Sequence, residues 1–314
     1  MITRCGTLLL CLCILSCGNG KQQPPARPTR EAQNVQVPEF DGKLAFEQLT
    51  RQTSFGPRVP GTSAHDECLK YLQTTLQNYG ATVTLQPFDH TGYSGELLKM
   101  TNVVASFNSV AATRILLIAH WDSRPQADQE QDASKRSLPI LGANDGASGV
   151  AILMEIARHL RNNPPATGID MLLVDGEDYG REGDLDNYLL GTKYFVDHLP
   201  PGFKPAFGIL LDMVGDKDLE IPKEPNSLQY APDIVELIWS TAKSMGVYQF
   251  SDRIQRPVID DHLPLNEAGI KTVDLIDFDY PQWHTTGDTP DKCSPESLQA
   301  VGRVLMQVLY SQRE

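Results

Sequence analysis

Four compact apolar runs recur along this chain, and acidic residues or a histidine close or follow each of them. The runs are RILLIAH (114–120), IDMLLVD (169–175), FGILLDMVG (207–215) and KTVDLIDF (271–278). Continuous apolar runs of this length are typical of buried strands in a parallel sheet. Helical patterns separate them. This alternation predicts one three-layer α/β domain with a mostly parallel central sheet flanked by helices.

The remaining predicted elements complete that domain. A further strand is expected at TNVVASF (101–107), and amphipathic helices are expected at 41–52, 63–80, 145–163, 233–246 and 295–310. The second helix has the clearest limits, because Ser63 and Asp66 resemble a capping box and Gly80 is a typical stop.

The polar residues after the strands predict a site. They are His120 with Asp122, Asp175 with Glu177 and Asp178, Asp212, and Asp277 with His284. In open α/β sheets the ligand crevice lies beyond the carboxyl ends of the strands, so we expect these groups to converge there.

Residues 1–17 are predicted to be a signal peptide. Arg4 supplies the positive charge, residues 8–15 are apolar but too short to span a membrane stably, and ILSC resembles a lipobox. This predicts cleavage before Cys17 and lipidation of its thiol. The alternative is a plain secretory signal cleaved near Gly18 or Gly20. The chain is therefore expected to be exported, either lipid-anchored through Cys17 in the periplasm of a Gram-negative-type bacterium or secreted.

Residues 18–40 are rich in proline and polar residues and are predicted to be a tether, which leaves 41–314 as a single catalytic domain. Outside the leader only Cys68 and Cys293 remain, and the sequence leaves open whether they pair. No zinc-finger spacing occurs, so a metal site must use histidine and carboxylates. The net charge of −13 argues against a nucleic-acid partner.

Three acidic residues are candidates for chemistry. Asp145 lies at a loop-to-helix junction, where helix capping is the commoner role of aspartate. Glu177 and Asp178 follow a buried strand; a solvated turn would explain them, but neighbouring carboxylates can also divide metal binding and proton transfer.

His284 completes a candidate metal set with Asp145 and Asp178. Two carboxylates and one imidazole leave tetrahedral zinc one open position, as a catalytic site requires. Asp212 and Asp260 are further candidates. Capping could explain Asp260, whereas an acid at the end of an apolar strand, such as Asp212, is seldom free.

The motifs AHWDSRP, GANDGASG, DGED, LLDMVG, DDHLPL and QWHTTGDTPD occur in an order that resembles zinc-dependent glutaminyl cyclases of the metallopeptidase-like type. The resemblance extends from about Asp41 to the C-terminus. It implies a mixed central sheet flanked by helices, as in zinc aminopeptidases. It also implies the following roles: one zinc on Asp145, Asp178 and His284; catalytic acid and base at Glu177; a hydrogen-bonded acidic pair of Asp212 and Asp260; and substrate contacts from Trp283 and Tyr280.

Some positions depart from the animal enzymes of that family. Asp178 replaces a longer glutamate, Asp274 stands where those enzymes have a histidine, and the loop 179–188 lacks their pocket tryptophan. Trp121 is a candidate to supply part of the missing wall.

The resemblance implies that the chain converts the N-terminal glutamine of peptides or proteins to pyroglutamate and releases ammonia. Two alternatives remain. His120, Asp145 and Asp212 could hold a second metal, as in a di-zinc aminopeptidase, and a lipid-anchored binding protein could use the same scaffold without catalysis.

Overall fold

A six-stranded sheet forms the centre of the computed structural model, which describes residues 1–2, 36–181 and 183–312. Its order is β1-β2-β4-β3-β5-β8. The strands are β1 (Thr82–Thr91), β2 (Leu97–Phe107), β3 (Arg114–His120), β4 (Gly168–Val174), β5 (Phe207–Asp212) and β8 (Thr272–Ile276). Strands β4, β3, β5 and β8 pair in parallel, whereas β1 and β2 pair antiparallel to their neighbours. The predicted mixed sheet is confirmed.

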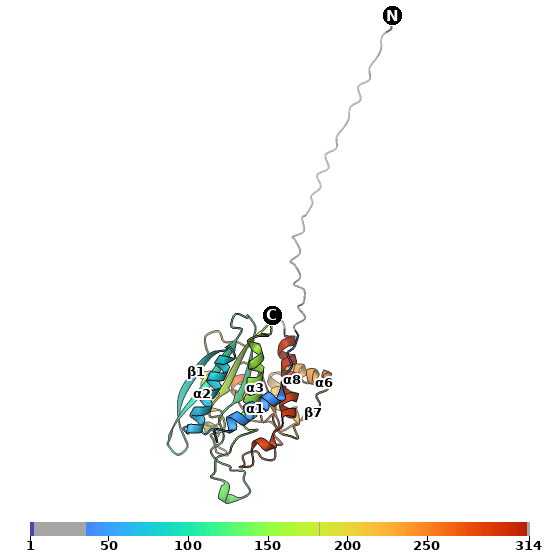
Figure 1. Ribbon diagram of the computed structural model, residues 1–314. Helices are drawn as coiled ribbons and strands as arrows, with labels where there is room; N and C mark the ends of the chain where they lie inside the picture. Colours follow the sequence, from blue (N-terminus) through green and yellow to red (C-terminus); the bar gives the residue numbers. More distant parts are fainter. Residues whose placement is uncertain (3–35, 182, 313–314) are drawn as a thin grey trace. The chain divides into compact units, whose positions relative to one another are not determined.

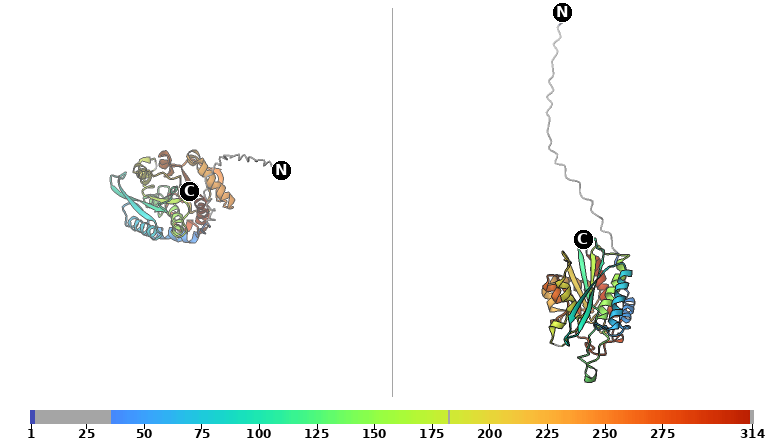
Figure 2. Two further views of the ribbon diagram at one scale, coloured as in Figure 1. Left: turned by 90° about the horizontal axis from the view of Figure 1, so that it is seen from above. Right: turned by 90° about the vertical axis from the view of Figure 1, so that its left-hand side faces the viewer.

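Helices cover both faces of this sheet (Figures 1 and 2). Side chains from α1 (Gly42–Thr53), α2 (Ser63–Asn78), α3 (Ala147–Leu160), α6 (Pro232–Ser244) and α8 (Pro295–Ser311) share one apolar core with Ile115 and Leu117 of β3. Leu116 and Ile118 point to the other face, where they pack with α4 (Leu190–Asp197) and α7 (His262–Glu267). Side chains alternate along a strand, so a strand covered on both faces must be apolar throughout.

Helix limits follow local chemistry. Asp41 caps α1 by accepting from the amides of Lys43 and Leu44, and Ser294 caps α8 by accepting from Ser297. The remaining elements are short: α5 (Pro225–Tyr230), the 3-10 turns Ala133–Lys135, Leu185–Asn187 and Pro290–Lys292, and a two-stranded parallel sheet of β6 (Ile221–Lys223) and β7 (Phe250–Ile254).

The structure differs from the sequence-based expectation at the sheet edge. Strand β1 was not predicted, and β2 begins four residues earlier than expected, at Leu97. Most side chains of β1 are exposed or half-buried, so this edge strand lacks the apolar run that marks the central strands. The predicted strand 207–215 ends at Asp212, which leaves Met213 and Val214 in the loop beyond it.

Residues 3–35 lie outside the described part of the chain, and with them Cys17, the predicted leader and most of the tether, so these stay predictions. Among the described residues, no helix has both the length and the apolar character needed to cross a membrane. Cys68 and Cys293 are both buried and free, which answers the question of their pairing.

Candidate active site

The carboxyl ends of the parallel strands meet at one edge of the sheet, as expected. His120 ends β3 opposite Val174 of β4, Asp175 follows that residue, and Asp212 ends β5 opposite Ile276 of β8. The four strands run in the same direction, so the loops that follow them converge.

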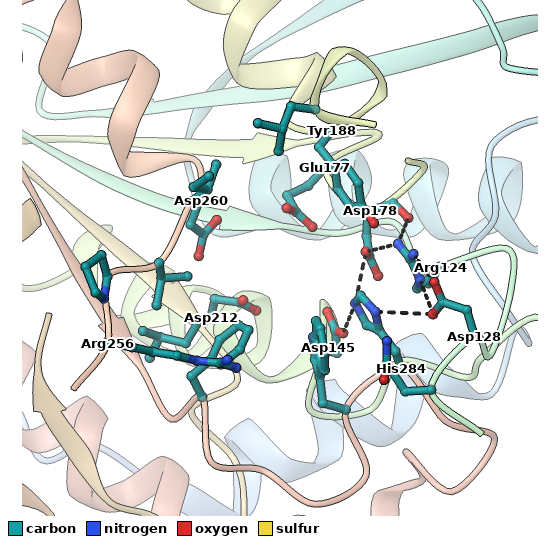
Figure 3. A pocket seen from close by; sticks show the side chains of 18 of the residues that line it. Arg124, Asp128, Asp145, Glu177, Asp178, Tyr188, Asp212, Arg256, Asp260 and His284 are labelled. Carbon is teal, nitrogen blue, oxygen red and sulfur yellow. Dashed lines mark hydrogen bonds and ion pairs between the residues drawn. The ribbon is translucent and has the colours of Figure 1, made fainter. Parts of the chain in front are cut away.

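A cavity of about 480 Å³ opens at this edge. Seven of the predicted site residues line it: Asp145, Glu177, Asp178, Asp212, Asp260, Trp283 and His284. Figure 3 shows Glu177, Asp178 and Asp212 facing the same space. The volume lies within the range of about 300–1,000 Å³ that is usual for small-molecule sites.

Asp145, Asp178 and His284 form a compact group. His284 Nε2 lies 3.2 Å from Asp178 Oδ1 and 3.7 Å from Asp145 Oδ2. One ligand atom from each residue falls within 4.8 Å of the other two, and all three side chains are buried. This arrangement can hold a metal ion.

Two orphaned oxygens in this group support a cation. Asp145 Oδ2 and Asp178 Oδ2 are buried and have no hydrogen-bond partner. A buried carboxylate oxygen without a partner is costly, and a bound cation removes that cost. Two carboxylates and one imidazole suit zinc and leave a position open for substrate.

His120, Asp145 and Asp212 form a second group that shares Asp145 with the first. His120 Nε2 lies 3.1 Å from Asp145 Oδ1 and 3.1 Å from Asp212 Oδ1. One oxygen of each carboxylate, Oδ1, therefore already contacts the imidazole, whereas Oδ2 of Asp145 and of Asp178 has no partner.

Asp145 does not cap a helix. The N-cap of α3 is Gly146, and no side chain caps that helix. Gly146 has a φ of 102°, and a Cβ there would lie 2.4 Å from the carbonyl oxygen of Asp122. Only glycine fits this position. Because Asp145 does not cap the helix, its side chain is free to face the cavity.

Two buried residues, Arg58 and Asp288, hold the backbone of the loop that carries Asp145. Arg58 is fully buried and donates to the carbonyls of Trp121, Leu141 and Gly142 at 2.7–2.9 Å. Asp288 accepts from the backbone amides of Asn144 and Asp145. The loop that carries Asp145 is therefore fixed through its backbone.

Asp122 and Arg124 position the neighbouring acids. The Asp122 carboxylate accepts from the backbone amides of Glu177 and Asp178. Arg124 donates to Asp178 Oδ1 at 2.8 Å and also pairs with Asp128. Burial alone would raise the pKa of Asp178, but His284 and Arg124 together lower it.

His284 adopts a left-handed backbone conformation, with a φ of 54°. Such a conformation is unfavourable for a non-glycine residue and persists only where the surroundings hold it. The Trp283 ring stacks on the imidazole at 3.9 Å, and Nδ1 of His284 lies 3.4 Å from Asp128 Oδ1. A ligand histidine usually has such a partner on its other nitrogen.

Glu177 and Asp260 are the acids of the cavity with strongly raised pKa values. Burial raises the pKa of Glu177 well above its usual value, Asp178 adds to this effect, and His120 opposes it. Burial also raises the pKa of Asp260, followed by the charge of Asp212. The two aspartates are electrostatic neighbours, although no hydrogen bond joins them: Asp260 Oδ1 accepts from the amide of Asp261.

Two aromatic side chains that were predicted to line the cavity, Trp121 and Tyr280, do not line it. Trp121 is fully buried, and its ring stacks on that of His65 with the centroids 4.3 Å apart. Its indole N–H donates to the carbonyl of Thr101, so Trp121 supports the segment after β3 from within the core. Tyr280 is also buried, and its hydroxyl donates to Asp288. Neither residue lines the cavity. Residues two or three positions away do line it, namely Phe278, Trp283 and Arg124.

Several cavity residues were missed from the sequence. Arg124, Asp128, Tyr188 and Arg256 all line the cavity. Arg124 lies within the motif AHWDSRP, just after a strand. Asp128 follows it four residues later, and this spacing of opposite charges could have indicated an ion pair near the site. No comparable signal marks Tyr188 or Arg256.

Comparison with known proteins assigns the family. Residues 102–309 match the model of peptidase family M28. The chain belongs to peptidase family M28. This span contains the whole set of candidate ligands and acids.

Solved structures that resemble this chain carry different names. A Bacteroides thetaiotaomicron glutaminyl cyclase is 41% identical with a TM-score of 0.86, and the match covers 88% of this chain and 100% of that one. A leucine aminopeptidase precursor from the same species is 41% identical with a TM-score of 0.87, over 89% and 100% of the two chains. A mouse glutaminyl-peptide cyclotransferase-like protein is 27% identical, over 79% of this chain and 70% of that protein.

Proposed function

We propose that this protein is a zinc-dependent glutaminyl-peptide cyclotransferase, which converts an N-terminal glutamine to pyroglutamate and releases ammonia. The observation that carries the proposal is the joint placement of Glu177 with the Asp145–Asp178–His284 group in one cavity. The similarity to a bacterial glutaminyl cyclase over nearly all of the described chain supports the same activity.

One zinc ion per chain, held by Asp145, Asp178 and His284, is the metal content that we propose. Asp145 Oδ2 and Asp178 Oδ2 have no hydrogen-bond partner, whereas Asp145 Oδ1 and Asp212 Oδ1 already face His120. When bound, zinc supplies a Lewis acid for the side-chain amide carbonyl of the substrate.

Glu177 is proposed to carry the proton. Its carboxylate lines the cavity beside Asp178 and accepts no side-chain hydrogen bond from the described residues. It takes a proton from the substrate α-amine as the nitrogen bonds to the amide carbon, and it returns that proton to the departing ammonia. Because amine and amide belong to the same residue, holding them in contact supplies much of the rate advantage.

Asp212, Asp260 and Trp283 are proposed to orient the glutamine. The two aspartates lie across the cavity from His284 in Figure 3, where they can accept from the substrate amine. Trp283 stacks on His284 and contacts the tilted ring of Phe278, and it offers a flat apolar wall beside the ligand group.

A zinc aminopeptidase is the second candidate, and the His120–Asp145–Asp212 group is the observation that favours it. With a second metal on these residues, Glu177 would activate water instead of carrying the proton of an amine. The similarity to a leucine aminopeptidase precursor agrees with this reading.

Mass spectrometry separates the two activities. The zinc-loaded chain starting after Cys17 is incubated with one peptide that begins with glutamine and one that begins with leucine. Loss of ammonia from the first, with the second intact, is the expected result. Release of free leucine without cyclisation would assign the site to an aminopeptidase, and no change in either peptide would favour a binding protein. Metal analysis of the same sample is expected to give one zinc per chain.

We also propose that the chain is exported and lipid-anchored through Cys17. The lipobox-like ILSC and the polar stretch that follows it support this location. Mass spectrometry of the mature N-terminus in a bacterial host tests it. A diacylglyceryl-modified Cys17 is the expected result, and an unmodified terminus at Gly18 or beyond would indicate a plain secretory signal.

A further inference from the structure

Arg256 lines the active-site cavity on a wall that no proposed catalytic step uses. It lies in the loop between β7 and α7, and residues 256–259 of this loop line the cavity together with Asp260. Arg256 and Ile259 are exposed, whereas Asp260 is buried. The wall therefore runs from the buried acids to solvent, along the path that a peptide would follow from its first residue outward.

The guanidinium of Arg256 has no acidic partner in the part of the chain that the structure describes. Arg124, the other arginine of the cavity, is buried and paired with Asp128 and Asp178. Arg253 is exposed like Arg256 but pairs with Glu220 and Asp279. Arg256 instead rests on Phe278, with its central carbon 4.3 Å from the ring centroid.

This stacking is compatible with ligand binding. A guanidinium that lies on an aromatic ring uses one face of its plane, and the N–H groups at its edge stay available for a bidentate contact with a carboxylate. The ring also limits the motion of the side chain, which reduces the entropy lost when the contact forms.

The charges around the cavity make the position of Arg256 selective. Six carboxylates line the cavity: Asp128, Asp145, Glu177, Asp178, Asp212 and Asp260. These groups disfavour an acidic side chain at most places on the wall. Arg256 offers the one unpaired cation among the described lining residues. It is therefore the place on the wall where a substrate carboxylate would be stabilised.

We propose that Arg256 is a specificity-determining residue that selects peptides with an acidic side chain shortly after the N-terminal glutamine. This inference rests on the proposed cyclase activity and names its preferred substrate class. The glutamine occupies the buried acids and the ligand group, and the chain leaves along 256–259, where a glutamate or aspartate side chain meets the guanidinium.

A glutamate scan tests this inference. The substrates are C-terminally amidated peptides that begin with glutamine, with neutral residues elsewhere and a single glutamate at position 2, 3 or 4. Each is compared with the peptide that has glutamine at the same internal position. We expect one position at which glutamate raises kcat/KM by roughly threefold to tenfold, which is the effect of one partly screened charge pair. This advantage should shrink as salt is added.

Variants assign the effect to Arg256. Arg256→Gln should abolish the preference for glutamate, and Arg256→Glu should turn it into a preference for lysine at the same position. Loss of folding cannot produce such an inversion. Arg253→Gln is the matched control, because Arg253 is exposed on the neighbouring strand and does not line the cavity; it should keep the wild-type preference.

The outcomes separate this inference from the proposed function. If the neutral peptides are cyclised but no position favours glutamate, or if Arg256→Glu keeps the wild-type preference, the role of Arg256 is wrong while the cyclase activity stands. If no glutamine peptide is cyclised, the proposed function itself fails, and this inference fails with it.

Discussion

Arg124 joins two sides of the candidate metal site. Its Nη1 lies 2.8 Å from Asp178 Oδ1, and its Nη2 lies 2.5 Å from Asp128 Oδ2. Asp128 in turn lies 3.4 Å from Nδ1 of His284. One buried side chain therefore contacts the candidate ligand Asp178 directly and the candidate ligand His284 through Asp128.

We expect Arg124→Gln to lower zinc affinity by roughly 10- to 100-fold, the usual effect of removing a group that orients a ligand. Competition with a chromophoric chelator measures this affinity. Arg253→Gln, away from the cavity, is the control and should bind zinc like the wild type. An unchanged affinity in Arg124→Gln would show that the ligands are oriented without the arginine.

Glu177→Gln should lower kcat for a glutamine peptide by roughly 10²–10⁴-fold, because the amide cannot exchange a proton with the substrate. Zinc content should stay at the wild-type level, since Glu177 is not among the proposed ligands. The measurement is steady-state kinetics together with metal analysis. Full activity in this variant would remove Glu177 as the proton carrier.

His284→Ala should lose the metal. In the wild-type protein, zinc at 100 times its dissociation constant should stabilise the fold by about 2.7 kcal/mol, which is lost on chelation. Thermal unfolding with and without zinc measures this difference. In the variant the melting temperature should no longer depend on zinc, whatever the effect of the substitution on the fold. A persistent zinc-dependent shift would mean that the ligand set is wrong.

Arg58→Met should destabilise the protein by about 3 kcal/mol, because three carbonyls each lose a hydrogen bond from the guanidinium, two of these bonds being fully buried. Denaturant unfolding measures this change. Arg51→Met is a suitable control, since Arg51 lies on the exposed side of α1 and stacks on Phe55. An equal and small effect of both substitutions would show that the buried hydrogen bonds contribute little.

Asp277 should make stability depend on pH. Burial raises its pKa from 3.8 to about 6, the charges of Asp216 and Asp279 add to this, and the amides of Glu220 and Asp279 oppose it. Between these two values the folded state binds more protons than the unfolded state, so its stability falls as pH rises.

The comparison with Asp277→Asn isolates this effect. The stability of the wild-type protein relative to the variant should decrease from about pH 4 to pH 7 and then level off. Urea unfolding at several pH values measures it. A difference that is constant with pH would mean that Asp277 titrates alike in the folded and unfolded chains.

The central strands and most of the candidate ligands could be predicted from the sequence. Strands β3, β4, β5 and β8 are buried on both faces, so each needs a continuous apolar run, and the polar residues after them stand out by contrast. Parallel strands bring their carboxyl ends to one edge, so Asp178 and Asp212 could be assigned to one site without coordinates.

Only the tertiary structure decided which side chains face the cavity and which support it. Trp121 and His120 are adjacent in sequence, yet one stacks inside the core on His65 and the other contacts two cavity aspartates. Arg256 reaches the same cavity from a distant loop. Side-chain direction and long-range contacts depend on the packing of segments far apart in the chain, and no local pattern of residues records that packing.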